Sequence, residues 1–136
     1  MGQHDESLHF LYECLRIRRV QLGDDSHKDI CETLSFIASI FRRKNVDKAL
    51  SLLRMILNMK SKRLSTDKES DCRELLVAYS DVLEVVKEKL TLDRHDKSLH
   101  EEIATLFFKL GILFEKLHQY NDAVSYYNKC LKVSLF

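Results

Sequence analysis

The sequence contains no proline and no tryptophan, and its glycines are limited to Gly2, Gly23 and Gly111. Proline and glycine punctuate turns and β-arches, so their scarcity in 136 residues favours long helices joined by short polar links. No apolar run has the length of a membrane span, and no signal-peptide core precedes a small-residue cleavage site. We therefore expect one intracellular, cytoplasmic domain over residues 1–136.

The chain also lacks an excess of either charge. It has 22 basic and 21 acidic residues, and a net charge of +1 gives no electrostatic reason to expect nucleic acid or an anionic membrane as partner. Its cysteines lie far apart without a C-x-x-C pair, which favours buried thiols over disulfides. His27 and Cys31 have metal-ligand spacing on a helix, but two ligands make a weak site. We expect no metal and no cofactor.

Apolar residues recur at helical spacing along almost the whole chain, and sustained alternation is absent. Thr66 and Glu69, and again Ser98 and Glu101, have the spacing of a capping box at a helix start. These signals together predict about six helices, over residues 6–21, 26–44, 46–63, 66–90, 98–117 and 121–134.

An internal period links the first half of the chain to the second. Ala38 and Ser80 lie 42 residues apart, as do Ser7 and Ala49, and each is a small residue at which two helices can approach closely. The links between the predicted helices are too short for any arrangement other than antiparallel neighbours. The pattern predicts an all-α chain of helix–turn–helix repeats.

The C-terminal copy carries the most detailed pattern, which reads Phe107-x-x-Leu110-Gly111-x-x-Phe114, then Tyr120, then Ala123-x-x-x-Tyr127. An earlier copy reads Leu34-x-x-Ile37-Ala38-x-x-Phe41 and Ala49-x-x-x-Leu53. Both patterns resemble the tetratricopeptide repeat (TPR). The string from Leu15 to Asp25 and the period of 42 are similar to the longer repeats of the kinesin light chain type.

The resemblance implies a right-handed α-solenoid of antiparallel helix pairs, with a half repeat at 6–22 and repeats at 26–63 and 98–134. Residues 66–97 depart from it as an irregular long helix and link. Only 31 residues separate Ser80 from Gly111, which leaves no room for a second helix of that repeat. Either the repeat has lost this helix, or the fourth and fifth helices form a longer hairpin.

The resemblance also implies a groove lined by the first helix of each pair. Two features of known TPR ligand sites are missing: the Lys/Asn set that clamps a C-terminal carboxylate, and the asparagines of kinesin light chains, replaced here by Ser35 and Phe36. A groove for a charged peptide or helix and a solvated face without ligand both remain open. By register, the groove residues are Glu32, Ser35, Ser39, Arg42, Arg43, Glu74, Val77, Asp81, Glu84, Thr105, Phe108, Ile112 and Lys116.

No nucleophile with a base, no Gly-rich phosphate loop and no metalloprotease motif is present, so we do not expect an enzyme. Basic clusters such as Arg16, Arg18 and Arg19 fall near predicted helix C-termini, where cations complement the helix dipole. We expect a protein–protein interaction scaffold that binds a peptide or helix of a partner. The alternative is a structural subunit of a larger assembly, which meets a second copy or a neighbouring subunit through its convex face and through apolar, uncapped ends such as Val133 to Phe136.

Overall fold

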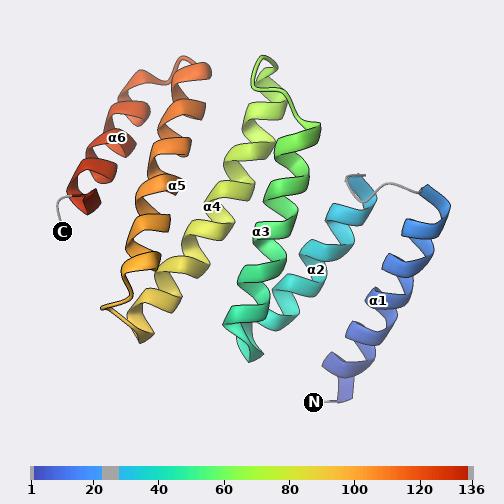
Figure 1. The fold of residues 1–136 in the computed structure, drawn as a ribbon. Coiled ribbons are helices and arrows are strands. Elements are labelled where there is room, and N and C mark those ends of the chain that lie inside the picture. Colours follow the sequence, from blue (N-terminus) through green and yellow to red (C-terminus); the bar gives the residue numbers. More distant parts are fainter. Residues whose placement is uncertain (1, 23–27, 135–136) are drawn as a thin grey trace. The chain divides into compact units, whose positions relative to one another are not determined.

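The computed structural model describes residues 2–22 and 28–134, without the side chains at 2–5, 7, 18, 21, 22, 28, 29, 43 and 134. The described residues form six helices and no strand (Figure 1). The all-α class of antiparallel helix pairs is therefore confirmed, whereas a single domain over 1–136 stays a prediction. The helices are α1 (Gly2–Leu22), α2 (Lys28–Lys44), α3 (Val46–Arg63), α4 (Glu69–Leu92), α5 (Lys97–Lys116) and α6 (Tyr120–Ser134).

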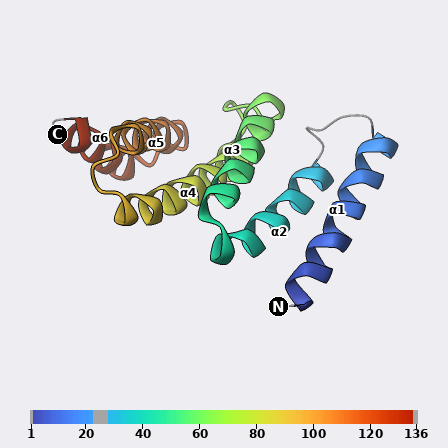
Figure 2. The ribbon, with the colours of Figure 1, turned by 60° about the horizontal axis from the view of Figure 1, so that its bottom comes forward.

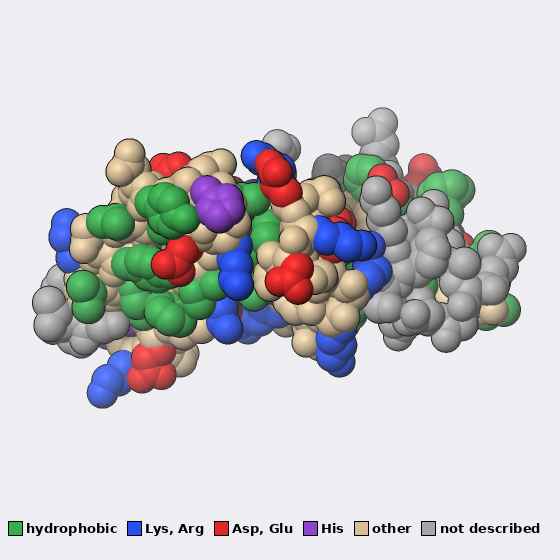
Figure 3. Space-filling view, turned by 90° about the horizontal axis from the view of Figure 1, so that it is seen from above, with side chains coloured by type: hydrophobic (Ala, Val, Ile, Leu, Met, Phe, Trp, Pro, Cys, Tyr) green, Lys and Arg blue, Asp and Glu red, His purple; other side chains and the backbone are tan. Residues whose placement is uncertain are grey.

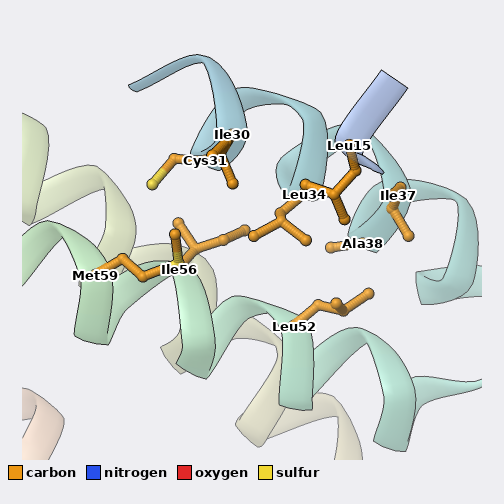
Figure 4. Packing of buried hydrophobic residues seen from close by; sticks show 9 residues of the cluster. All are labelled: Leu15, Ile30, Cys31, Leu34, Ile37, Ala38, Leu52, Ile56 and Met59. Carbon is orange, nitrogen blue, oxygen red and sulfur yellow. The ribbon is translucent and has the colours of Figure 1, made fainter. Parts of the chain in front are cut away.

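The chain divides into two compact units, unit 1 (Met1–Arg63) and unit 2 (Leu64–Phe136). In unit 1, α2 packs against both α1 and α3, and successive helices run in opposite directions (Figures 1 and 2). Apolar side chains from the three helices point toward one another in a shared core (Figure 4). Its buried members are Leu15 of α1, Ile30, Cys31, Leu34, Ile37 and Ala38 of α2, and Leu52, Ile56 and Met59 of α3.

A single residue, Asn45, separates α2 from α3. Its N–H donates to the carbonyl of Phe41 at 2.7 Å, and its side-chain Oδ1 accepts from the N–H of Lys48 at 3.2 Å. Asn45 therefore ends one helix and caps the next, because an asparagine oxygen satisfies an N–H group that the first turn leaves without a helical partner. The tight turn keeps α2 and α3 antiparallel, and Ala38 and Ala49, the small residues of the predicted period, are both buried.

In unit 2, α4 and α5 pack against each other as a long antiparallel hairpin of 24 and 20 residues (Figure 1). This is the second of the two arrangements left open by the sequence, and α4 is one uninterrupted helix. Near the open end of the hairpin, a core forms from the buried Cys72, Leu75 and Leu113. The partly buried Leu64, Leu76, Tyr79 and Leu117 pack against it.

Both predicted capping boxes are wrong in position. Helix α4 begins at Glu69 after Lys68, which supplies no side-chain cap, and the Glu69 carboxylate pairs with Arg73 at 2.8 Å instead of reaching back. In the link before α4, the hydroxyl oxygen of Ser65 accepts from the N–H of Asp67 at 3.2 Å, which stabilises a turn and leaves the helix start without a side-chain cap. Several polar residues in a row offer alternative caps, and the sequence spacing does not choose among them.

The cap of α5 lies two residues before the predicted Ser98. The carboxylate of Asp96 accepts from the N–H of Ser98 at 3.0 Å and from its hydroxyl at 2.6 Å. These hydrogen bonds hold the pKa of Asp96 below its ordinary value. An aspartate is a better cap here because its negative charge also favours the positive end of the helix dipole.

Aromatic rings fill the contact between α5 and α6. Phe114 stacks on Tyr126 with ring centroids 5.3 Å apart, and Phe108 lies 5.9 Å from Tyr127. Between them, Gly111 faces the Tyr127 ring so closely that an added Cβ would lie 2.6 Å from the nearest ring carbon. The Tyr127 hydroxyl donates to the Glu115 carboxylate at 3.2 Å. Only glycine allows this ring to lie flat against the α5 backbone.

The turn between α5 and α6 is built on His118, which has a φ of 62°. The N–H of His118 donates to the Glu115 carbonyl at 3.0 Å, and the N–H of Gln119 donates to the Phe114 carbonyl at 2.9 Å. This pair of bonds is a Schellman motif, in which the left-handed residue is usually glycine. The imidazole Nδ1 lies 2.9 Å from the Tyr120 hydroxyl, which holds the histidine side chain at the start of α6.

We predict that Gly111→Ala lowers the free energy of unfolding by about 1–2 kcal/mol, although alanine is the better helix former, because its methyl group would overlap the Tyr127 ring. Urea unfolding followed by circular dichroism measures the change. In the background of Tyr127→Leu the same substitution should be neutral or stabilising. Equal costs of Gly111→Ala in both backgrounds would show that the ring contact is not the cause.

Candidate functional site

The predicted groove residues of unit 1 lie along one face of α2. Glu32, Ser35 and Ser39 are exposed, and Arg42 is half-buried. The side chain of Arg43 lies outside the described residues. The Ser39 hydroxyl donates to the carbonyl of Phe36 at 2.7 Å, so its proton is engaged by the helix itself. The face therefore offers a mixed set of charged and polar groups rather than a row of available donors.

An open apolar groove runs beside this face, between α1 and α2. It has a volume of about 470 Å³, and two large rings lie at its surface: Phe10 is 67% exposed and Phe36 is 58% exposed. Of the predicted set only Ser39 contributes to it. The groove is lined by Glu6, Phe10, Leu11, Phe36, Ser39 and Ile40.

Phe10 and Phe36 are not among the residues predicted from the sequence to form the groove. The available signal lay in α1, where Phe10, Ile17 and Val20 lie off the face of Leu8, Leu11 and Leu15 that enters the core. A helix with apolar residues on two sides has more apolar surface than one neighbour covers. In the structure Val20 is 76% exposed, and Ile17 is 45% exposed.

The remaining predicted residues belong to unit 2. On α4, Val77 and Glu84 are exposed, and Glu74 and Asp81 are half-buried. On α5, Thr105, Phe108 and Lys116 are exposed, and Ile112 is half-buried. The Thr105 hydroxyl donates to the Glu101 carbonyl at 3.0 Å, as Ser39 does in unit 1 to its own helix. Phe108 contacts Tyr127, so the predicted face of α5 continues onto α6.

Helix α6 extends this surface with apolar residues. Tyr120, Val124 and Leu131 are each more than half exposed, and the spacing of 120, 124, 127 and 131 places them with Tyr127 on one stripe. Figure 3 shows hydrophobic side chains gathered at the left, over α5 and α6. A patch of this kind on a helical surface marks an interaction site more often than single exposed apolar residues do.

Lys116 has a different setting from the rest of the predicted set. It lines a small hollow of about 210 Å³ together with Cys72 and residues of the α3–α4 and α5–α6 links. The Cys72 thiol is 1% exposed and donates to the carbonyl of Thr66 at 3.1 Å. Burial raises the pKa of Cys72 and outweighs the opposing charge of Lys116, so the thiol stays protonated and unreactive.

Basic side chains lie in the last turns of two helices. The last turns of α1 and α3 are basic, with Arg19 in α1 and Lys60, Lys62 and Arg63 in α3, as the dipole interpretation predicted. His27 lies outside the described residues, and within the described ones no three metal-ligating side chains come together. Among the same residues, none of the helices combines the length and apolar character needed to cross a bilayer.

The chain is similar at low identity to solved structures of other proteins. No family model and no curated protein matches the sequence. A solved structure of a Podosopora anserina kinesin light chain with nearly identical TPR-like repeats is 17% identical over 98% of this chain and 68% of its own, with a TM-score of 0.43. The structure of BtubC (BKLC) from P. vanneervenii is 16% identical over 98% of this chain and 57% of its own, with a TM-score of 0.42.

We predict that the cysteines differ sharply in reactivity toward a thiol reagent in the folded protein. Cys14 and Cys130 are half-buried and should react first, whereas the buried Cys31 and Cys72 should react about a hundredfold more slowly, because labelling requires local opening. Mass spectrometry of peptides after timed labelling measures the four rates, and labelling in urea provides the control. Equal rates for Cys72 and Cys130 in the folded protein would contradict the burial of Cys72.

Proposed function

We propose that the chain is a non-enzymatic scaffold that binds a peptide or helix of a partner protein. The observation that carries the proposal is the open groove between α1 and α2, where Phe10 and Phe36 expose most of their ring surface. Aromatic side chains at the centre of an interface supply a large share of binding energy, because they bury much apolar area and lose little conformational freedom.

The polar residues beside the groove fit the same role. Glu32, Ser35 and Arg42, with Arg43 by register, would form a rim along α2 in unit 1. In unit 2, Glu74, Asp81 and Thr105 would form a second polar rim, with the apolar Ile112 and Phe108 on the same predicted face and Lys116 at its end, by the hollow of Cys72. Rim charges guide association and select partners, and they add little affinity when solvent reaches them. An amphipathic helix, apolar on one side and charged on the other, matches such a surface.

The experiment compares proteins captured from a native extract by the wild type and by matched variants. Phe10→Ala and Phe36→Ala should each weaken capture of a specific partner about tenfold, while Met55→Ala, at a 43% exposed apolar residue of α3 outside the groove, should leave it unchanged. Arg42→Ala, Asp81→Ala and Lys116→Ala test the rim and should have smaller effects. Circular dichroism verifies folding. Undiminished capture by both phenylalanine variants would refute the groove.

A second candidate is a structural subunit that packs the exposed apolar side of α6 against a second copy or a neighbouring subunit. The apolar stripe of Tyr120, Val124, Tyr127 and Leu131 on α6 favours it. Contact through this stripe predicts that the protein self-associates with rising concentration and that Leu131→Glu abolishes the association. Asn121→Glu, also exposed on α6, is the matched control. Sedimentation as a monomer at every concentration, with intact helicity, would argue against a self-assembling subunit.

A further inference from the structure

A second pocket lies in unit 2 at the turn between α4 and α5, apart from all the residues discussed above. Its volume is about 410 Å³, within the range of pockets that hold small ligands or a few side chains of a peptide. The last turns of α4 supply three of its residues, the link supplies Arg94, and the first turn of α5 supplies His100. The lining consists of Lys87, Leu90, Thr91, Arg94 and His100.

The charged groups of this pocket are all of one sign. Lys87 and Arg94 carry full positive charges, and no aspartate or glutamate is among the described residues that line it. The nearest carboxylates in the link already have backbone partners: Asp93 accepts from the N–H of His95 at 3.3 Å, and Asp96 accepts from Ser98. Glu88 lies on α4 between Lys87 and the turn and has its own interactions. The lining itself is therefore basic, and the carboxylates of Asp93 and Asp96 accept from backbone N–H groups of the link.

One contact holds the Lys87 ammonium, and another holds the backbone of Arg94. The Lys87 ammonium lies 5.4 Å from the centroid of the buried Phe107 ring, which holds the side chain against α5. His100 Nε2 lies 2.9 Å from the carbonyl oxygen of Arg94, and since a carbonyl only accepts, this nitrogen is the donor. That hydrogen bond ties the link to α5. It therefore restrains the backbone from which the Arg94 side chain extends.

Between these groups the surface is apolar. Leu90 is half-buried, and the Thr91 hydroxyl donates to the carbonyl of Glu88 at 2.6 Å, so its hydrogen is engaged by the helix. No phenylalanine, tyrosine or tryptophan is among the described residues that line the pocket, and the His100 imidazole is held at the Arg94 carbonyl, so the lining offers no row of aromatic rings on which bases could stack. An aliphatic floor with a cationic rim calls for a ligand that has an aliphatic group beside a negative charge.

We propose that this pocket binds an acidic peptide segment of a partner protein, with a leucine-like side chain on Leu90 and neighbouring carboxylates on Lys87 and Arg94. The pocket thus adds a second contact region, in unit 2, to the proposed scaffold function, on which this inference rests. A guanidinium can hold a carboxylate by two parallel hydrogen bonds, which makes Arg94 the residue that selects for acidic side chains.

The test measures the fluorescence anisotropy of a short labelled peptide in which leucines alternate with aspartates. A second peptide has asparagine in place of every aspartate. The wild-type protein should bind the acidic peptide and not the asparagine peptide, and binding should weaken with rising salt. Arg94→Gln should weaken it about fivefold, and the double variant Lys87→Gln, Arg94→Gln about twentyfold. Lys109→Gln, at an exposed lysine of α5 outside the pocket, should have no effect.

Several outcomes would overturn the proposal. Equal affinity for the two peptides would show that the pocket does not select an acidic ligand. Unchanged affinity for the acidic peptide on Arg94→Gln, in a protein with normal circular dichroism, would show the same. A single-stranded RNA that binds more tightly than the peptide and loses affinity in the same variant would assign the pocket to nucleic acid instead. Lys87 and Arg94 lie outside the groove of Phe10 and Phe36, so the two proposals can fail separately. If the phenylalanine variants lose their partners from the extract but the acidic peptide does not bind, the scaffold function is supported and the pocket proposal is refuted.

Discussion

The contact of the Tyr127 ring with Gly111 fixes how closely α5 can approach α6, and the surrounding arrangement follows from it. With the backbones this close, Phe107, Phe108 and Phe114 meet Tyr126 and Tyr127 ring to ring. The Lys129 ammonium then lies over both rings, 5.9 Å from the centroid of Phe107 and 4.6 Å from that of Tyr126, in cation–π contacts. A rigid α5 in turn gives α4 a fixed partner, and the pocket at their turn depends on that pairing.

The other helix pairs are held close together by different features. In unit 1, Ala38 and Ala49 are buried small residues, and Asn45 alone joins the two helices, so a short link and small side chains replace the glycine. In unit 2, the α4–α5 hairpin has a longer link, which Asp96 and His100 hold through hydrogen bonds. Such links leave backbone and charged side chains at the surface, which is why the basic pocket lies at this turn and not along the helices.

The helices and most of the core could be predicted because apolar spacing reports which side of a helix is buried. Ile30, Leu34 and Ile37 follow that rule. The short distance from Ser80 to Gly111 left two arrangements of α4 and α5 open, and the hairpin is visible only in the packing of the two helices. The residues that accept from backbone N–H groups before each helix could not be predicted individually. Near Ser65, and separately near Asp96, several neighbouring polar side chains can accept from the same N–H groups. The exposed Phe10 and Phe36 could not be placed either, because spacing shows that a residue is apolar and does not show what covers it.

Exposed charges alone cannot make the predicted groove faces selective for one partner. The ion pairs of Arg16 with Glu13 and of Arg73 with Glu69 lie within single exposed helices, where solvent screens them and each contributes well under about 1 kcal/mol. The helix faces predicted as groove are built largely from such groups, with Ser39 and Thr105 turned to their own backbone. Selective binding therefore requires sites where charge adjoins uncovered apolar surface, because burial of that surface removes water and strengthens the neighbouring polar contacts. The groove of unit 1 and the pocket of unit 2 both meet this condition.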